Sequence, residues 1–304
     1  MSRAYLEEFD YLAPEHGFLE AARFDARDPK AARAVVIPFG LESSVTYGSG
    51  TSDGPAAILA ASDQLELFDD ELQCEPCHEF GVATLKPVEI DGQLERALIQ
   101  LETTVSRVVS AGRFPLVLGG EHALTAGAVR PFVERFDNLV VVQIDAHADL
   151  RDGYLGQHYS HAAVMRRVLD APVVSLMSFG IRALSIEERD FFLRNRDRID
   201  IYWGRDIGFW DWDDVSRKLR GRPVYLTFDV DGLDASEMPA TGTPVPGGLS
   251  YRQAMDTVRR VAAASTIVGA DVVELAPISG FHAYDFTAAS VAYKILSYAL
   301  TESR

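Results

Sequence analysis

Short aliphatic runs alternate along the chain with longer amphipathic segments. The aliphatic runs include "AVVIPFG" at 34–40, "FPLVLGG" at 114–120, "LVVVQIDAHAD" at 139–149, "PVYLTFDVDG" at 223–232 and "STIVGADVVELAP" at 265–277. They lack alternating polar residues, which is typical of strands that are buried on both faces of a sheet. The pattern predicts an α/β fold in which helices cover both faces of a mostly parallel sheet.

The alternation continues without interruption, which predicts a single domain over residues 1–304. No internal repeat, low-complexity stretch or charge block divides the chain. Its 304 residues, of which 47% are hydrophobic, are enough to bury a large core.

The composition excludes several classes of protein. A formal charge of −16 and a pI near 4.8 argue against a nucleic-acid partner, because phosphate binding requires clustered Lys and Arg. No stretch approaches the ~18 consecutive apolar residues of a membrane span, and the start "MSRAYLEEFD" is acidic where a signal peptide is basic. We therefore expect a cytoplasmic protein with no membrane partner. Cys74 and Cys77 form a C-x-x-C pair, but no second half of a zinc site follows, and we favour a structural role.

Ionisable side chains gather where the aliphatic runs end. Asp145, His147 and Asp149 stand at every second position, so an extended chain projects all three to the same face. The ends of the other runs carry His122, Asp229, Asp231 and Glu274, and Asp234 follows after a glycine. Ligands bind at the carboxyl ends of the strands in open parallel sheets, so we expect these side chains to meet there.

Four aspartates and two histidines at one sheet edge would repel one another unless cations neutralised them. Carboxylate oxygens and imidazoles without thiolates suit a pair of divalent ions, for which Mn²⁺ is the natural candidate and nickel or another divalent ion an alternative. A metal pair lowers the pKa of bound water towards neutrality. The cluster therefore predicts metal-assisted hydrolysis.

The motifs around these positions resemble those of the ureohydrolase superfamily, the arginases and agmatinases. The matching segments are "GGEHAL", "QIDAHADLR", "YSHAAVMRR", "FDVDGLD" and "TGTPVPGGL". The resemblance covers most of the chain and is closest to agmatinase-like members. It implies a three-layer α/β/α fold of the arginase type, assembly as homotrimers or homohexamers, and hydrolysis of agmatine, a small cationic guanidino compound, to putrescine and urea.

The resemblance also implies a role for each site residue. His122, Asp145, Asp149 and Asp229 match the ligands of one Mn²⁺. Asp145, His147, Asp229 and Asp231 match those of a second, so that Asp145 and Asp229 bridge the pair. Asp149, also a ligand, would orient the nucleophile, His161 matches a histidine assigned to proton transfer, and Glu274 matches the glutamate that pairs with the guanidinium.

Two positions depart from the commonest pattern of the family. Glu121 replaces a frequent aspartate beside His122, and we expect little effect because the histidine is the ligand. The segment 278–285 also differs, and we expect it near the substrate tail, although a structural role is favoured for His282 and Tyr284. This segment therefore bears on which guanidino compound is the substrate.

Several alternatives to agmatine share the same metal core. Guanidinobutyrate, guanidinopropionate, free guanidine, arginine and formimidoylglutamate could all be hydrolysed by it, and the loops that bind the tail would decide among them. A non-catalytic protein that keeps the metal site for stability or for binding a partner is an alternative of another class. The presence of His161 and Glu274, which act only on substrate, argues against it.

Overall fold

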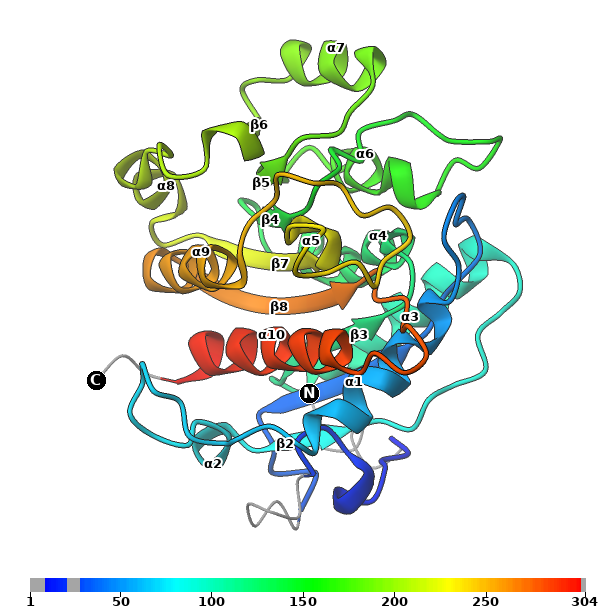
Figure 1. The fold of residues 1–304 in the computed structure, drawn as a ribbon, viewed down its shortest axis with the longest axis vertical. Coiled ribbons are helices and arrows are strands. Elements are labelled where there is room, and N and C mark those ends of the chain that lie inside the picture. Colours follow the sequence, from blue (N-terminus) through cyan, green and yellow to red (C-terminus); the bar gives the residue numbers. More distant parts are fainter. Residues whose placement is uncertain (1–8, 21–27, 302–304) are drawn as a thin grey trace.

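A single eight-stranded sheet runs through the protein. The structure, a computed structural model, describes residues 9–20 and 28–301. The strand order is β2-β1-β3-β8-β7-β4-β5-β6, and every neighbouring pair is parallel. In Figure 1 the strands are stacked from β6 at the top to β2 at the bottom. The predicted parallel sheet is therefore confirmed.

The strands and helices alternate along the sequence. The strands are β1 (Ala34–Phe39), β2 (Val82–Thr84), β3 (Phe114–Gly119), β4 (Val140–Ile144), β5 (Ser175–Ile181), β6 (Ile199–Trp203), β7 (Pro223–Asp229) and β8 (Thr266–Val273). The α-helices are α1 (Gly54–Ser62), α2 (Cys77–Phe80), α3 (Leu94–Ser110), α4 (Thr125–Ala128), α5 (Arg130–Val133), α6 (Val164–Val168), α7 (Ile186–Arg194), α8 (Trp212–Leu219), α9 (Tyr251–Ala264) and α10 (Ala283–Leu300). Short 3-10 turns lie at Pro14–His16, Thr51–Asp53, His122–Leu124, His161–Ala163, Gly204–Asp206 and Val230–Gly232.

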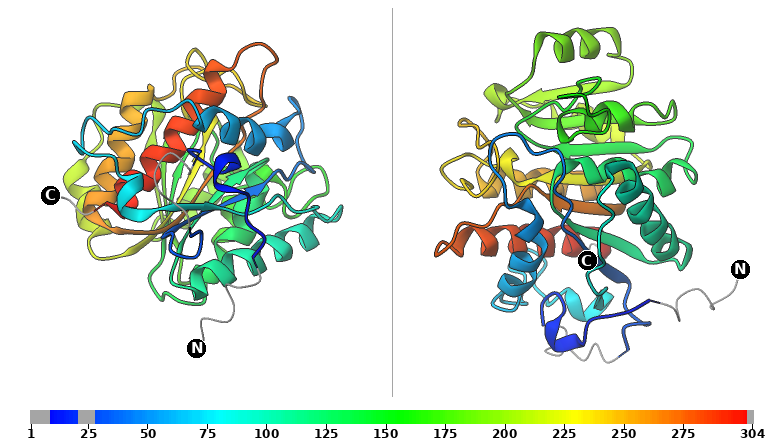
Figure 2. Two further views of the ribbon diagram at one scale, coloured as in Figure 1. Left: turned by 90° about the horizontal axis from the view of Figure 1, so that it is seen from below. Right: turned by 90° about the vertical axis from the view of Figure 1, so that its right-hand side faces the viewer.

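Side chains of alternate strand residues enter two separate hydrophobic cores. Val140 and Val142 face the core that α1, α8, α9 and α10 cover, whereas Val141 faces the core under α3, α4, α5 and α6. The two helical layers lie on opposite sides of the sheet in Figure 2, with α9 and α10 on one side and α3 on the other. This is the three-layer α/β/α arrangement that the family resemblance implies.

Two details of the elements were not evident from the pattern. Strand β2 has three residues, too few to stand out as an aliphatic run, and it pairs only with β1 at the edge of the sheet. The segment "EHALTAGAVRPFVERF", one amphipathic unit in the sequence, forms a 3-10 turn followed by the short helices α4 and α5. Pro131 occupies the first turn of α5, where the missing amide proton is tolerated.

The four central strands, β3, β8, β7 and β4, end at the same edge of the sheet, to the right in Figure 1. Gly120 follows β3, and a Cβ on this residue would lie 2.1 Å from the carbonyl oxygen of Leu41. The glycine therefore allows the segment after β1 to pack against the end of β3, as the amide of Glu121 confirms by donating to the same carbonyl at 2.7 Å. No helix in the described ranges 9–20 and 28–301 is long and apolar enough to cross a membrane.

Candidate active site

The acidic and imidazole side chains of the four central strand ends converge on one point. His122 follows β3, and Glu274 follows β8. Asp229 ends β7, and Asp231 lies in the 3-10 turn after it. The residues that follow β4 are Asp145, His147 and Asp149. All of them except Asp145, which is fully buried, line a cavity of about 180 Å³. The four aspartates and two histidines of this set are called the floor of the cavity below. The structure thus brings together all seven strand-end residues that the sequence analysis selected, with the buried Asp145 between the two histidines.

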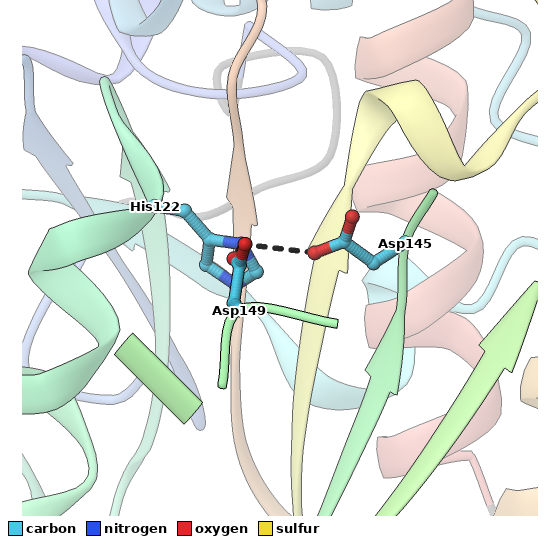
Figure 3. Close-up of side chains that lie close together, drawn as sticks. All are labelled: His122, Asp145 and Asp149. Carbon is cyan, nitrogen blue, oxygen red and sulfur yellow. Dashed lines mark ion pairs between the residues drawn. The ribbon is translucent and has the colours of Figure 1, made fainter. Parts of the chain in front are cut away.

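One half of the floor is centred on His122. Its Nδ1 lies 3.1 Å from Asp145 Oδ2, 3.0 Å from Asp149 Oδ2 and 3.3 Å from Asp229 Oδ2. Figure 3 shows the carboxylates of Asp145 and Asp149 close to the His122 ring. Nδ1 is buried and aligned for a hydrogen bond with none of the three. A nitrogen lone pair and three carboxylate oxygens that face one point are the donor set of a divalent cation.

The other half of the floor is centred on His147. Its Nδ1 lies 2.9 Å from Asp231 Oδ2 and 3.7 Å from Asp145 Oδ1. The ligand atoms of Asp145, His147 and Asp231 all lie within 4.8 Å of one another, as do those of Asp145, His122 and Asp149. Asp145 therefore belongs to two groups that could each hold a metal ion.

Backbone amides fix the aspartates in place. The amide of His147 donates to Asp145 Oδ1 at 2.5 Å, that of Ala146 to Asp231 Oδ1 at 3.0 Å, and that of Asp231 to Asp229 Oδ1 at 2.8 Å. In the bonds of Asp145 and Asp229, the carboxylate accepts from the amide two residues later, which forms a local turn. The D-x-H and D-x-D spacing therefore sets the local backbone as well as the direction of the side chains.

The floor carries more carboxylate charge than burial tolerates. Burial, followed by the neighbouring Asp145, raises the pKa of Asp149 to about 7. Burial and the nearby Asp231 and Asp145 also raise the pKa of Asp229 well above its ordinary value. The charge of Asp231 and the hydrogen bond to Asp145 outweigh burial and raise the pKa of His147 to about 12. All three pKa values are raised, which means that this group of residues is stabilised by added positive charge. The residues therefore fit divalent cations.

A buried chain of hydrogen bonds supports His122 from behind. Its Nε2 lies 2.8 Å from Thr227 Oγ1, and Thr227 lies 3.5 Å from the hydroxyl of Thr125. Asp271 ends the chain, because its Oδ2 accepts from Thr125 at 2.9 Å and from the Tyr225 hydroxyl at 2.8 Å. These residues were not selected from the sequence, since single buried polar residues in a strand or at the start of a helix carry no local signal of a site.

Glu274 and His161 complete the cavity lining above the floor. Glu274 Oε1 accepts from the amide of His122 at 2.6 Å, which leaves Oε2 for a ligand. Burial raises the pKa of Glu274 to about 8. His161 begins a 3-10 turn and packs edge-on against Tyr154. Burial, with the nearby charges of His122 and His147, lowers the pKa of His161 to about 4.

Two floor and lining residues have left-handed backbone conformations. Asp149 has φ = 52° and Glu274 has φ = 66°. The Asp149 carbonyl accepts from the amides of Met165 and Arg166 at 3.0 and 3.2 Å, and the Glu274 amide donates to Gly120 at 2.8 Å. Neighbouring segments therefore hold both residues in a conformation that non-glycine residues rarely adopt.

The rim of the cavity comes from loops. Gly242 and Thr243 belong to the segment "TGTPVPGGL" and Arg151 to "QIDAHADLR", but none of the three was given a role from the sequence. The segment 45–48 lies against Gly242 and Thr243, with the Gly48 amide 3.3 Å from the Gly242 carbonyl. Arg151 supplies the cationic side chain of the described lining. Its guanidinium lies over the ring of Tyr154 at 4.9 Å, and its Nε is 3.7 Å from Glu188.

Three other features of the sequence lie outside this cavity. Asp234 accepts from the amides of Gly247 and Gly248 and thereby closes a loop. Cys74 and Cys77 are free thiols, and neither belongs to a candidate metal group of the described residues. The segment 278–285 is largely exposed, and none of its residues lines the described cavity.

Comparisons with known proteins agree with this geometry. The model of the Arginase family matches residues 32–299. An N(1)-aminopropylagmatine ureohydrolase from Synechocystis sp. is 37% identical, with 88% of this chain and 89% of that protein covered. An agmatinase from Bacillus anthracis is 33% identical, with 82% and 86% covered.

A solved structure shares the fold as well. The agmatine ureohydrolase of Thermoplasma volcanium is 30% identical, with a TM-score of 0.80 over 90% of this chain and 91% of that one. The sheet, the convergent strand ends and these relatives lead to one conclusion: the chain belongs to the arginase family and is a hydrolase of guanidino or amidino compounds.

Proposed function

We propose that this protein hydrolyses agmatine to putrescine and urea with two Mn²⁺ ions bound at the cavity floor. The observation that carries the proposal is the position of Glu274 and His161 above a floor of two imidazoles and four aspartates within one cavity. The relatives named agmatinase and agmatine ureohydrolase support the guanidino substrate.

The two candidate ion positions share ligands. His122, Asp145, Asp149 and Asp229 would hold one ion, and Asp145, His147, Asp229 and Asp231 the other. The family resemblance implies this assignment, and it is supported by the two groups of donor atoms that contain Asp145 and by the 3.3 Å between His122 Nδ1 and Asp229 Oδ2. When bound, the ions would lower the pKa of water and stabilise negative charge that develops during hydrolysis.

The side chains of the protein bind and orient the reactants. Glu274 would hold the planar guanidinium by accepting charge-assisted hydrogen bonds from its N–H groups at the free Oε2. Asp149 would orient the attacking water by accepting a hydrogen bond. His161, neutral near pH 7, would take up a proton and deliver it to the departing amine, since its imidazole lines the same cavity.

A second candidate substrate is N1-aminopropylagmatine. The relative with 37% identity carries that name, and this substrate differs from agmatine only in the tail beyond the guanidinium. Arginine and guanidinobutyrate carry a carboxylate instead. The described cavity offers it only Arg151, which already contacts Glu188 and Tyr154, so we expect both to be weaker substrates.

A substrate panel tests the proposal. The protein is loaded separately with manganese and with nickel, and kcat/KM is measured for agmatine, N1-aminopropylagmatine, arginine, guanidinobutyrate, guanidinopropionate and guanidine through release of urea. Formimidoylglutamate is assayed through release of formamide. We expect the two agmatine compounds to lead with manganese. A clear preference for any other compound would overturn the agmatine assignment.

The absence of all turnover in protein with two ions bound would instead favour the non-catalytic alternative. Assembly as a homotrimer or homohexamer and a cytoplasmic location stay predictions, which size determination in solution and cell fractionation can check.

A further inference from the structure

A buried glutamate outside the cavity floor is connected to the cavity through one serine. Glu121 is fully buried, and its Oε2 accepts from the backbone amide of Ser44 at 2.6 Å. The Ser44 hydroxyl lies 3.1 Å from the same Oε2 and 3.1 Å from His161 Nδ1. The three residues come from distant parts of the chain, at separations of 77 and 117 residues.

The position of Ser44 is fixed by the backbone on both sides. The amide of Glu121 donates to the carbonyl of Leu41 at 2.7 Å, which pins the segment after β1 to the end of β3. On the other side, the amide of His161 donates to Ser44 Oγ at 3.0 Å. The hydroxyl therefore sits between the carboxyl group and the imidazole, with little freedom to move away from either.

The number of protons in this group determines the direction of its hydrogen bonds. Ser44 Oγ has one proton and two lone pairs, and the amide of His161 takes one of the lone pairs. Glu121 Oε2 is an acceptor, because the amide of Ser44 can only donate to it. Glu121 Oε1 is buried and has no hydrogen-bond partner among the described residues, so losing the hydroxyl proton from Oε2 would leave the carboxyl group poorly satisfied.

The remaining lone pair of Ser44 faces the imidazole. With the hydroxyl proton directed to Glu121, Oγ can only accept from His161, whose Nδ1 must then carry the proton. A neutral imidazole carries a proton on only one nitrogen, so Nε2 is then unprotonated and has a free lone pair. We infer that Ser44 and Glu121 are positioning residues that hold His161 as the Nδ1–H tautomer, so that Nε2 is ready to accept a proton from the cavity.

The length of the glutamate side chain matters for this arrangement. An aspartate at position 121 would be one methylene shorter and would withdraw its oxygen from Ser44. Glu121, whose effect we expected to be small because His122 is the candidate ligand, thus gains a role through a different neighbour. The consequence for turnover rests on the proposed function, whereas the tautomer itself does not.

The first measurement reads the tautomer directly. ¹⁵N-histidine spectra of the full chain are recorded at neutral pH, and His161 is assigned with a His161→Gln variant. We expect an Nδ1–H signal in the wild type and a shift towards Nε2–H in Ser44→Ala. An Nε2–H ring in the wild type would overturn the inference, whether or not the protein hydrolyses any guanidino compound.

The second measurement reads the effect on catalysis in the manganese-loaded protein. Ser44→Ala should lower kcat roughly tenfold and leave KM and metal content unchanged, because one hydrogen bond to the ring is lost. Ser44→Thr keeps the hydroxyl and should restore the tautomer and most of the rate. If Ser44→Ala fails to fold, Glu121→Gln and Glu121→Asp provide the same test, with the larger loss expected for the shorter aspartate.

A matched control is available in α10. Ser297 is fully buried, and its hydroxyl donates to the Tyr293 carbonyl within the helix. Ser297→Ala should change neither the His161 spectrum nor kcat. An unchanged kcat and an unchanged His161 spectrum in Ser44→Ala would contradict the inference, and a wild type without turnover of any substrate in the panel would contradict the proposed function instead.

Discussion

The two histidines of the cavity floor have different surroundings. The His122 side chain is 1% exposed, and its second nitrogen is engaged by Thr227 at 2.8 Å. The His147 side chain is 29% exposed and opens onto the cavity. Both face Asp145. The half of the floor around His122 is buried in the core, whereas the half around His147 is reached by solvent. We therefore expect the ion held by His122 to bind more tightly than the ion held by His147.

Removing the shared carboxylate should have the largest effect on metal content. Asp145→Ala withdraws negative charge from both halves of the floor, so at least one ion should be lost and turnover abolished. Metal analysis of the purified, manganese-loaded variant measures this. Two tightly bound ions in Asp145→Ala would refute the ligand assignment.

Replacing each histidine separately should reveal the asymmetry between the two halves. His147→Asn should lose one ion and should lower the free energy of unfolding in chelator by a smaller amount than His122→Asn does, because its side chain is 29% exposed and water can reach Asp231 once the imidazole is gone. His122→Asn should also lose an ion, but it should lower that free energy by about 1–3 kcal/mol, because a buried hydrogen bond to Thr227 is disturbed.

Chemical denaturation in chelator excludes the contribution of bound ions from this comparison. Equal destabilisation by the two variants would show that the halves do not differ in the way their exposure indicates.

Changing Glu274 tests a group that contacts the buried half and that we propose to bind the substrate. Glu274→Gln can still accept the amide of His122, so fold and metal content should be unchanged. The loss of charge should reduce kcat/KM for agmatine by roughly 10- to 150-fold, which corresponds to about 1.5–3 kcal/mol for a charge-assisted hydrogen bond. An unchanged kcat/KM would mean that Glu274 only supports the backbone.

The smallest effect is expected when Thr227, the hydrogen-bond partner of His122 Nε2, is replaced. Thr227→Val removes the hydroxyl beside His122 Nε2 and should weaken binding of the tighter ion roughly tenfold, as is typical of partners of metal ligands. Competition with a chelator measures the affinity. Thr257→Val is the control, since Thr257 is equally buried but donates within α9, and its metal affinity should match the wild type.

The floor of the cavity was predictable from the sequence because its residues lie close together in the chain, directly after aliphatic runs. Asp145, His147 and Asp149 follow one strand at every second position, and parallel strands bring their carboxyl ends to one edge. The rim was not predictable, because the segment 45–48 meets Gly242 only through tertiary packing. The hydrogen bond from Ser44 to Glu121 was not predictable either, since the two residues are 77 positions apart and neither belongs to a periodic pattern in the sequence.

The buried support of His122 was also invisible in the sequence. Thr227 and Thr125 are separated by 102 residues, and Thr125 and Asp271 by 146. Within the strands and turns that hold them they look like ordinary polar substitutions in aliphatic runs. The sheet order β3-β8-β7-β4, which no local pattern reports, is what makes them neighbours.

Glu274 has a left-handed backbone conformation, with φ = 66°. This conformation lowers the stability of the fold at a residue that we propose to bind the substrate. A glutamate in this conformation raises the free energy of the folded state by about 1 kcal/mol, whereas glycine or asparagine adopts it with less strain. A directed-evolution screen that selected only for heat resistance would therefore weigh this relief of strain against the loss of the hydrogen bond from the buried His122 amide to the Glu274 carboxylate. A screen that selected for turnover would retain it, so libraries meant to improve the enzyme should leave this codon unvaried.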